Sequence, residues 1–243
     1  MGGLSEKALN YQHLAAIYDA IMGDHEGVLK YAEMLQDVLK KGKILDLACG
    51  TGDLTITLSN LGYQMSGLDL SESMLEIAKL KSKTDEIRFF CADMLDFDLG
   101  EKFDGIVCAN DSVNYCSSLE QLAKLFEGVN RHLTVDGVFV FDYHQVSRLQ
   151  EFEEAFDEEG MVNDVGYWWH IESEPPMLRH TITIYSSGYP VVENHDQYIF
   201  ELDEILRLLN MKGFHCQLIE SSDYDDLYAN EKWMIKAIKE REL

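Results

Sequence analysis

The chain has 243 residues, enough for one large domain or for one domain with a modest insertion, and 46% of them are hydrophobic. Only 3 residues are proline, and this composition predicts a folded chain, not a disordered one. The formal net charge of −24 arises from 44 acidic and 20 basic residues and repels phosphate backbones, so no nucleic-acid partner is expected.

Cysteine usage and hydropathy narrow the class of protein further. The 5 cysteines are odd in number and include no C-x-x-C pair, which favours reduced thiols over a disulfide framework. The sequence contains neither H-E-x-x-H nor another metal-ligand spacing, so no bound metal is predicted. No apolar run reaches about 18 residues and no basic segment precedes an apolar stretch, so we expect no membrane span and no cleaved signal. The expected location is the cytoplasm.

Two helices are predicted before the first strand. Apolar and aromatic residues recur at helical spacing at Tyr11, Leu14, Ala15 and Tyr18, as in an amphipathic helix that packs on a sheet edge. A second helix is predicted over residues 25–39 and leads into the first strand.

A strand followed by a glycine turn predicts a binding site for a nucleotide-type cofactor. Residues 43–47 form a short aliphatic run typical of a buried parallel strand, and the turn Gly50-Thr51-Gly52 separates it from a helix predicted over residues 55–61. Glycines let a ligand approach the backbone, and the helix amino terminus offers free N–H groups. An ordinary strand-to-helix turn is the alternative. Thr55 stands where G-x-G-x-x-G needs its third glycine, and no P-loop pattern occurs, which disfavours NAD, FAD and nucleoside triphosphates.

Acidic residues follow the second and third strands. Residues 64–68 predict a strand that ends at Asp69, where a carboxylate can accept hydrogen bonds from both hydroxyls of a ribose. The same residue would alternatively cap the helix predicted over residues 72–83, a role that Ser71 alone can serve. Residues 87–91 predict the third strand, which runs into Asp93 and Met94; a lone aspartate at such a position is more often a turn residue.

The loop after the fourth strand is predicted to face the cofactor. Residues 103–109 predict this strand, and a polar and aromatic loop runs from Asn110 to Tyr115. Doubly wound topology places the loop beside the first strand, where the strand order switches and ligands bind. A plain polar loop is the alternative. After a helix over residues 119–133 and a turn over 134–137, residues 138–141 predict a fifth strand with His144 near its carboxyl end, also toward the cleft.

From residue 147 the alternation of strands and helices is lost. Acidic residues between Glu151 and Glu159 predict an acidic helix, and residues 166–171, 179–185 and 197–200 predict antiparallel strands with turns at 175–176 and 187–188. We expect residues 147–199 to be an insertion that forms a substrate-side cap or a dimer surface. The remaining domain comprises residues 1–146 and 200–243, and it closes with a helix over 202–209 and strands over 213–220 and 232–239.

Several motifs resemble a known family. Residues 46–53 resemble motif I of the class I S-adenosyl-L-methionine (SAM) dependent methyltransferases in its variant D-x-x-C-G-x-G, with Ala48 and Cys49 in the region of the first glycine. Residues 67–75 resemble motif II. The runs Y-x-x-[FL]-A-x-x-Y-D and F-D-x-x-x-x-x-x-D-S-[LV]-N-Y resemble an uncharacterised small bacterial branch. The resemblance spans about residues 8–241 and is strongest over residues 46–115.

The resemblance implies an α/β fold: a Rossmann-like, doubly wound, seven-stranded and mostly parallel sheet with a small antiparallel β insertion. It implies that Asp69 binds the ribose, that Asp93 accepts from the adenine amino group and that Met94 donates its backbone N–H to the ring. Tyr11 and Tyr18 are implied to form a lid over the cofactor. The implied SAM-binding residues are Tyr18, Asp46, Ala48, Gly50, Gly52, Asp69, Leu70, Met74, Asp93, Met94 and Asn110.

The implied activity is methyl transfer from SAM to a small-molecule acceptor at nitrogen or oxygen. We expect a neutral or cationic acceptor, because residues 151–174 are rich in acidic residues and include no Lys or Arg. A non-catalytic module that binds SAM or a partner, an RNA methyltransferase and, third, a NAD-dependent enzyme are the alternatives. A homodimer is compatible with the sequence, and no general base is assigned. The acceptor-side candidates are Tyr11, Tyr115, His144 and His170.

Overall fold

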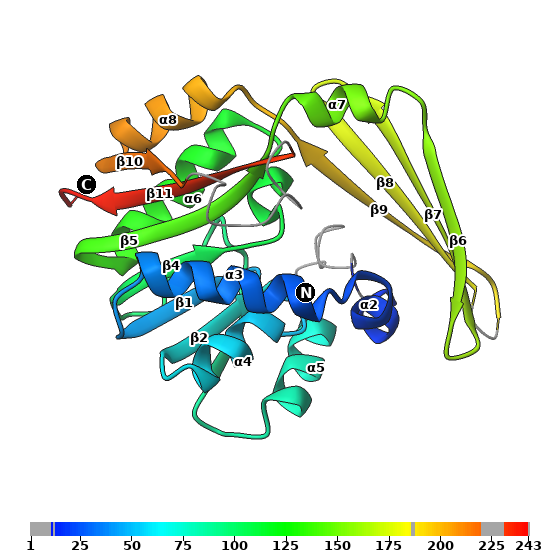
Figure 1. Ribbon diagram of the computed structural model, residues 1–243, viewed down its shortest axis with the longest axis horizontal. Helices are drawn as coiled ribbons and strands as arrows, with labels where there is room; N and C mark the ends of the chain where they lie inside the picture. Colours follow the sequence, from blue (N-terminus) through cyan, green and yellow to red (C-terminus); the bar gives the residue numbers. More distant parts are fainter. Residues whose placement is uncertain (1–10, 12, 186–187, 220–230, 243) are drawn as a thin grey trace, which may run out of the picture.

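The protein is described here by a computed structural model that covers residues 11, 13–185, 188–219 and 231–242. A seven-stranded sheet in the order β10-β11-β5-β4-β1-β2-β3 forms its centre (Figure 1). β1 to β5 pair in parallel and β11 runs antiparallel to both neighbours, which confirms the expected fold class. The strands are β1 (Lys43–Leu47), β2 (Gln64–Asp69), β3 (Arg88–Cys91), β4 (Phe103–Cys108), β5 (Leu133–His144), β10 (Phe214–Leu218) and β11 (Lys232–Lys239).

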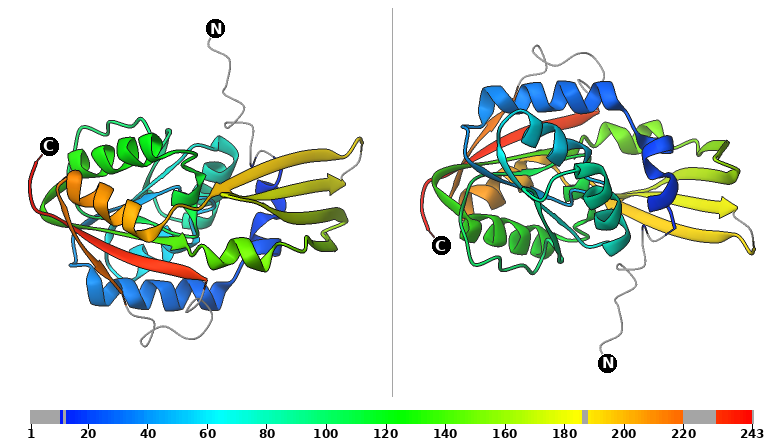
Figure 2. Two further views of the ribbon diagram at one scale, coloured as in Figure 1. Left: turned by 90° about the horizontal axis from the view of Figure 1, so that it is seen from above. Right: turned by 90° about the horizontal axis from the view of Figure 1, so that it is seen from below.

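Helices cover both faces of this sheet (Figure 2). The apolar sides of α3 and α4 pack against one face of the sheet, whereas those of α6 and α8 pack against the other. In α6, Leu122, Leu125, Phe126 and Val129 follow helical spacing and are fully buried, so one apolar stripe of this helix meets the sheet. The helices are α2 (Ala15–Met22), α3 (His25–Val38), α4 (Asp53–Asn60), α5 (Glu72–Ser82), the short 3-10 helix η1 (Ser112–Tyr115), α6 (Leu119–His132), α7 (Ser147–Glu151) and α8 (Leu202–Met211).

The insertion forms a second, antiparallel sheet of four strands that projects from the main body (Figures 1 and 2). Its strands, in spatial order, are β6 (Phe156–Val162), β7 (Val165–Glu174), β8 (Met177–Tyr185) and β9 (Val191–Tyr198). Leu14 and Ile17 of the amino-terminal segment pack against Ile182 and Ile184 of β8. The amino-terminal segment therefore joins the insertion to the half of the main domain that contains β1 to β3, α4 and α5 (the cofactor half), since α2 also contacts α5.

The expected acidic helix is wrong for most of its length. Only residues up to Glu151 are helical, in α7, and the acidic run continues as strand β6. Asn163 and Asp164 both have positive φ (47° and 65°) and form a tight turn that pairs β6 with β7 along its whole length. The charged side chains stay exposed on an edge strand, where they discourage pairing with another chain.

Two further boundaries differ from the sequence prediction. β5 begins at Leu133, not at residue 138, and the turn expected over 134–137 is an irregularity within the strand, marked by a positive φ of 62° at Asp136. The strands of the insertion are likewise longer than predicted. The turn expected at residues 187–188 lies partly outside the described residues.

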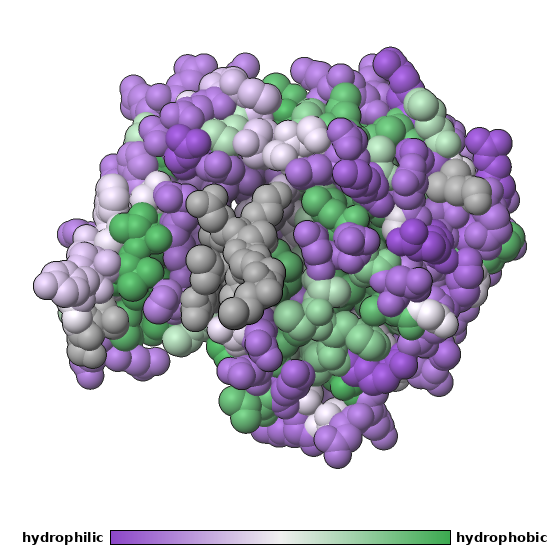
Figure 3. Space-filling view, turned by 180° about the vertical axis from the view of Figure 1, so that it is seen from behind, coloured by the Kyte–Doolittle hydropathy of each residue, from purple (hydrophilic) through white to green (hydrophobic). Residues whose placement is uncertain are grey.

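One face of the protein (Figure 3) is mainly hydrophilic, and the thiols of the chain are not paired in disulfides. Hydrophilic residues dominate the face shown in Figure 3, and hydrophobic residues gather there in separate patches. Across the described ranges, no helix is long and apolar enough to cross a membrane, and no cluster of three potential ligands suits a metal ion. All 5 cysteines are free; Cys108 and Cys116 are buried, whereas Cys91 is exposed.

Candidate active site

The glycine turn after β1 holds its backbone open toward the carboxyl edge of the sheet. Ala48, Gly50 and Gly52 all have positive φ (56°, 54° and 82°). A Cβ on Gly52 would lie 2.9 Å from the Ala78 Cβ of α5, so this glycine permits the close packing of α4 and α5. A Cβ on Gly50 would meet no atom within 4 Å, which leaves the backbone there accessible to a ligand.

Asp46 supports the turn from below. Its side chain is only 2% exposed and accepts a hydrogen bond of 2.5 Å from the Thr55 hydroxyl of α4. Burial raises the pKa of Asp46 to about 7 in spite of this bond. Thr55, the residue that replaces the third glycine of the dinucleotide pattern, thus ties β1 to the helix that follows it.

Asp69 lies at the carboxyl end of β2, directly beside the turn. Its Oδ2 accepts the Gly50 N–H and its Oδ1 accepts the Ser71 N–H, both at 2.8 Å. Burial raises the pKa of Asp69, against the effect of these N–H donors. Ser71 caps α5 by accepting the Met74 N–H, so Asp69 is not needed as the helix cap. Its carboxylate instead fixes the glycine turn.

The other predicted cofactor residues lie at the same edge. Asp93 and Met94 follow β3, and the Asp93 carboxylate accepts the Leu95 N–H at 2.8 Å. Asn110 follows β4 with a positive φ of 55° and an exposed side chain. Leu70 follows β2 directly, whereas Met74 is buried within α5. The carboxyl ends of β1 to β4 therefore gather the predicted set except Met74, which lies in α5, and Tyr18, which lies in α2.

Three tyrosines meet over this edge. The Tyr11 ring lies 5.9 Å from that of Tyr18 and 6.3 Å from that of Tyr115, and the hydroxyls of Tyr11 and Tyr115 are in hydrogen-bond contact. Burial, followed by the charge of Asp111, raises the pKa of Tyr18 to about 12, and burial also raises the pKa values of Tyr11 and Tyr115. All three remain neutral phenols near neutral pH.

α2 is fastened to the cofactor half by one carboxylate. Asp19 accepts a hydrogen bond of 2.5 Å from the Thr51 hydroxyl, and the Lys81 ammonium of α5 lies 2.7 Å from it. Lys81 also lies 2.5 Å from Asp53, at the start of α4. The segment that carries Tyr11 and Tyr18 is thereby held against the glycine turn.

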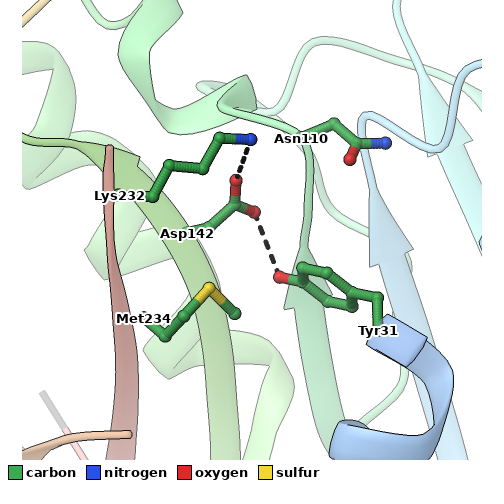
Figure 4. A pocket seen from close by; sticks show the side chains of 5 residues that line it. All are labelled: Tyr31, Asn110, Asp142, Lys232 and Met234. Atoms are coloured by element: carbon green, nitrogen blue, oxygen red, sulfur yellow. Dashed lines mark hydrogen bonds and ion pairs between the residues drawn. The ribbon is translucent and has the colours of Figure 1, made fainter. Parts of the chain in front are cut away.

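A buried charged cluster lies where β4, β5 and β11 meet (Figure 4). Asp142 is 1% exposed; it accepts the Tyr31 hydroxyl at 3.0 Å and the Asp111 N–H at 2.9 Å, and Lys232 lies 3.3 Å from it. Lys232 also lies 3.0 Å from the Asp111 carboxylate. Burial acts to raise the pKa of both carboxyls; it prevails for Asp142, whereas Lys232 and His144 hold the pKa of Asp111 below its ordinary value.

Sequence reasoning missed Tyr31 and Lys232 in this cluster. Together with Asn110, Asp142 and Met234 they line a pocket of about 10 Å³, room for a single water molecule (Figure 4). Lys232 stands at the start of a predicted strand and Tyr31 within a predicted helix, and neither position carries a signal of its own. Only the pairing of β11 with β5 brings Lys232 to Asp142.

His144 joins this cluster to the insertion. Its Nε2 lies 3.4 Å from the Asp111 carboxylate and 3.1 Å from the Gln197 side-chain oxygen, which also contacts His180 at 3.1 Å. Burial lowers the pKa of His144 and lowers that of His180 to about 4, so both rings are neutral near neutral pH. His144 therefore lies within a hydrogen-bonded network between the charged cluster and the insertion, and its acceptor-side role stays a prediction.

The acceptor-side position expected for His170 is wrong. Cross-strand pairing puts Trp169 of β7 opposite Ile182 of β8 and puts His170 opposite Thr181, so His170 faces away from the buried side of the sheet. Its ring stacks on Trp168 and its Nδ1 lies 2.9 Å from the Asp157 carboxylate. Strand alternation is the physical reason, because neighbouring residues point to opposite faces.

Glu193 of β9 was also missed, and it anchors the amino-terminal segment. Its carboxylate accepts the backbone N–H groups of Tyr11, His13 and Leu14 at 2.8, 2.8 and 3.2 Å and is only 4% exposed. The available signal was the alternation of Glu193, His195 and Gln197, which places the three side chains on one face of a strand. The segment that carries Tyr11 and Tyr18 is thus held to the glycine turn by Asp19 and to the insertion by Glu193.

Comparisons with known proteins agree with this geometry. Residues 44–137 match a family model described as a methyltransferase domain. The putative methyltransferase YqeM of Bacillus subtilis (strain 168) is 30% identical over 242 residues, which cover 95% of this chain and 98% of the relative. A dTDP-4-amino-2,3,4,6-tetradeoxy-D-glucose N,N-dimethyltransferase of Saccharopolyspora spinosa is 33% identical over 134 residues, 53% of each chain. The crystal structure of an S-adenosylmethionine-dependent methyltransferase from Clostridium acetobutylicum ATCC 824 aligns with a TM-score of 0.77 at 26% identity, over 94% of this chain and 98% of that one.

Proposed function

Because the chain belongs to the class I SAM-dependent methyltransferases, we propose that it transfers a methyl group from SAM to a nitrogen or oxygen atom of a small, neutral or cationic molecule. The observation that carries the proposal is Asp69, a half-buried carboxylate at the end of β2 that also fixes the glycine turn through Gly50. A ribose hydroxyl pair placed against this carboxylate would bring the methionyl part of SAM over Gly50, where the backbone is open.

The remaining cofactor contacts follow from the common edge. We assign the adenine ring to Asp93 and Met94 after β3, and the sulfonium side to Asn110 after β4. Asp46 acts through the turn that it supports, and Ala48, Gly52, Leu70 and Met74 shape the walls. Tyr18 of α2 closes the site from above.

The reaction is an in-line displacement at the sulfonium methyl. Its leaving group is a neutral thioether, so the protein contributes mainly alignment and the exclusion of water. Tyr11, Tyr18 and Tyr115 supply both, because their rings form a half-buried layer between the glycine turn and the insertion. Their neutral hydroxyls can orient the acceptor by hydrogen bonds.

Charge favours an acceptor without phosphate groups. The insertion includes only two basic residues, and both are engaged: Arg148 with Glu151 and Glu231, and Arg179 with Glu174 and Asp196. A nucleoside diphosphate group, such as the name of the sugar dimethyltransferase implies for that relative, would find little compensation here. A neutral or cationic amine fits the aromatic and uncharged side chains better.

We propose a role for residues 147–199 at the same site. We regard the insertion as the acceptor wall of a domain built from residues 1–146 and 200–243, because its buried face carries the polar side chains that meet the tyrosines. The 5 free thiols support a reducing compartment such as the cytoplasm.

Replacement of Asp69 by alanine tests the cofactor site. We expect SAM and S-adenosylhomocysteine to bind about ten- to hundredfold more weakly, because hydrogen bonds to a charged group contribute on the order of 1.5–3 kcal/mol. Titration calorimetry measures the affinities, and circular dichroism checks that the variant is folded. An unchanged dissociation constant would contradict the ribose assignment. Transfer of labelled methyl into small-molecule fractions of a cell extract separates an enzyme from a binding module. Calorimetry with NADH separates both from a NAD-dependent enzyme.

A further inference from the structure

His195 of β9 is buried beside Tyr11 and Tyr115, and among the described residues its ring has no hydrogen-bond partner. Its ring is 2% exposed, and neither ring nitrogen makes a hydrogen bond within the part of the chain that the structure describes. The other two histidines on this side each have Nε2 in contact with Gln197, although Nδ1 of His144 is also buried without a hydrogen-bond partner among the described residues. A buried polar group without a partner is costly, which makes this ring an unusual element of the wall.

The ring lies on the acceptor side of the tyrosine layer. Its centroid is 4.3 Å from that of Tyr11 and 6.3 Å from that of Tyr115, the two residues whose hydroxyls meet. The cofactor edge, with Asp69 and the glycine turn, lies on the other side of these tyrosines. An acceptor held between the insertion and the sulfonium therefore passes next to His195.

Glu193 prepares this histidine to hold a proton. Its Oε2 lies 3.6 Å from the His195 Nε2, a distance for charge attraction when the imidazole is protonated. Burial acts to raise the pKa of Glu193, yet His195 and the N–H groups of His13, Tyr11 and Leu14 hold it below its ordinary value. The carboxylate is thus ionised near neutral pH and faces Nε2, which leaves Nδ1 for another partner.

We propose that His195 contacts the nucleophilic atom of the methyl acceptor and takes its proton, a role that rests on the proposed function. The new C–N or C–O bond forms as the C–S bond breaks, and sulfur keeps the electron pair as a neutral thioether. The proton of the nucleophile moves to Nδ1 of His195, and the Glu193 carboxylate stabilises the resulting imidazolium. Buffer removes that proton after the product leaves.

The other groups around the ring are poor proton acceptors. Tyr11 and Tyr115 are neutral phenols whose pKa values are raised by burial. His180, paired across the strands with His195, already shares Gln197 with His144 and donates or accepts within that network. Glu193 is occupied by three backbone N–H groups. His195 is the residue of this group with a nitrogen to offer.

The test compares His195→Gln and His195→Asn with His170→Gln, which makes the same change on the opposite face of the same sheet. S-adenosylhomocysteine binding by calorimetry reports the cofactor site, and labelled methyl transfer to a panel of amino sugars and simple primary amines reports the reaction. We expect binding within about twofold of the wild type in all variants. For the two His195 variants we expect kcat to fall about 10²-fold with little change in KM. Their rates should rise with pH only as the acceptor amine loses its proton, so their pH profile should differ from that of the wild type.

Each other outcome overturns the role of His195, and one of them overturns the proposed function as well. A His195 variant that binds S-adenosylhomocysteine and keeps the wild-type rate and pH profile overturns the role of His195 alone. Loss of S-adenosylhomocysteine binding in both His195 variants assigns the ring to the fold and likewise overturns it. A wild-type protein that methylates no member of the panel but methylates RNA overturns the proposed function, and the role of His195 with it.

Discussion

At the scale of single residues, a comparison of Gly50 with Gly62 distinguishes the cost of backbone strain from the loss of a ligand contact. Gly50 and Gly62 both have positive φ (54° and 90°), and at both a Cβ would meet no atom within 4 Å. A side chain at either position costs about 1–2 kcal/mol, and more for a β-branched one, because L residues disfavour this conformation. They differ in place: Gly50 faces the cofactor edge, whereas Gly62 lies in an exposed turn after α4.

Gly50→Val is therefore expected to lose measurable binding of SAM, whereas Gly62→Val keeps it. Both variants should fold with similarly reduced stability, since the backbone strain is of the same kind. Calorimetry with S-adenosylhomocysteine and urea unfolding measure the two properties. Equal affinity in the two variants would show that the backbone at Gly50 does not approach the cofactor.

The raised pKa of Asp46 predicts how the stability of the protein depends on pH. Its pKa is about 7 in the folded protein against an ordinary value of 3.8, so the folded state holds this proton more tightly than the unfolded state. The free energy of unfolding therefore falls as pH rises from about 4 to about 7. This destabilisation is absent below that window and complete above it. Asp46→Asn lacks the group. Its free energy of unfolding should exceed that of the wild type increasingly between pH 4 and 7; parallel curves for the two proteins would contradict the burial argument.

At the scale of elements, the amino-terminal segment is fixed at two points that lie on different parts of the molecule. Glu193 holds its backbone from the insertion, and Asp19 holds α2 to Thr51 and Lys81. Movement of α2 would displace Tyr18, so we expect the ion pair with Lys81 to influence access to the site. The pair is partly exposed, and its strength should decrease with salt.

Lys81→Ala is expected to accelerate amide hydrogen exchange in α2 without changing exchange in β1. Lys79→Ala, on the same helix and exposed, serves as the matched control. Exchange followed by mass spectrometry resolves the two segments. Unaltered exchange in α2 would mean that apolar packing of Leu14 and Ile17, not the ion pair, holds the helix.

The elements also show what a sequence can and cannot predict. β1 and β2, with the residues at their ends, were predictable because apolar runs, glycines and acidic residues are local signals. The first part of β6 was predicted as helix, because its run of acidic residues has no apolar alternation. The turn at residues 163–164 pairs it with β7 all the same. Lys232 and Glu193 act on residues 90 and 182 positions away, and His170 was assigned to the wrong face because strand register depends on such distant pairings.

At the scale of the whole molecule, net charge decides between classes of acceptor. Binding of nucleic acid depends on several Lys and Arg contacts to phosphates, with roughly 6–10 in a specific complex. The net charge of −24 and the exposed acidic strand β6 oppose such contacts. We therefore expect no saturable binding of labelled total tRNA on filters at low salt and no methyl incorporation into it. Salt-sensitive, saturable binding with incorporation into RNA would contradict this.

The alternation along β9 has a genetic consequence. Glu193, His195 and Gln197 face the tyrosines because they occupy every second position of one strand. Deletion of a single codon within β9 would shift the rest of the strand by one place and turn the downstream members of this set to solvent. Such an allele is expected to encode a protein that keeps the proposed SAM-binding residues at β1 to β4 but has lost the polar side chains on the acceptor side.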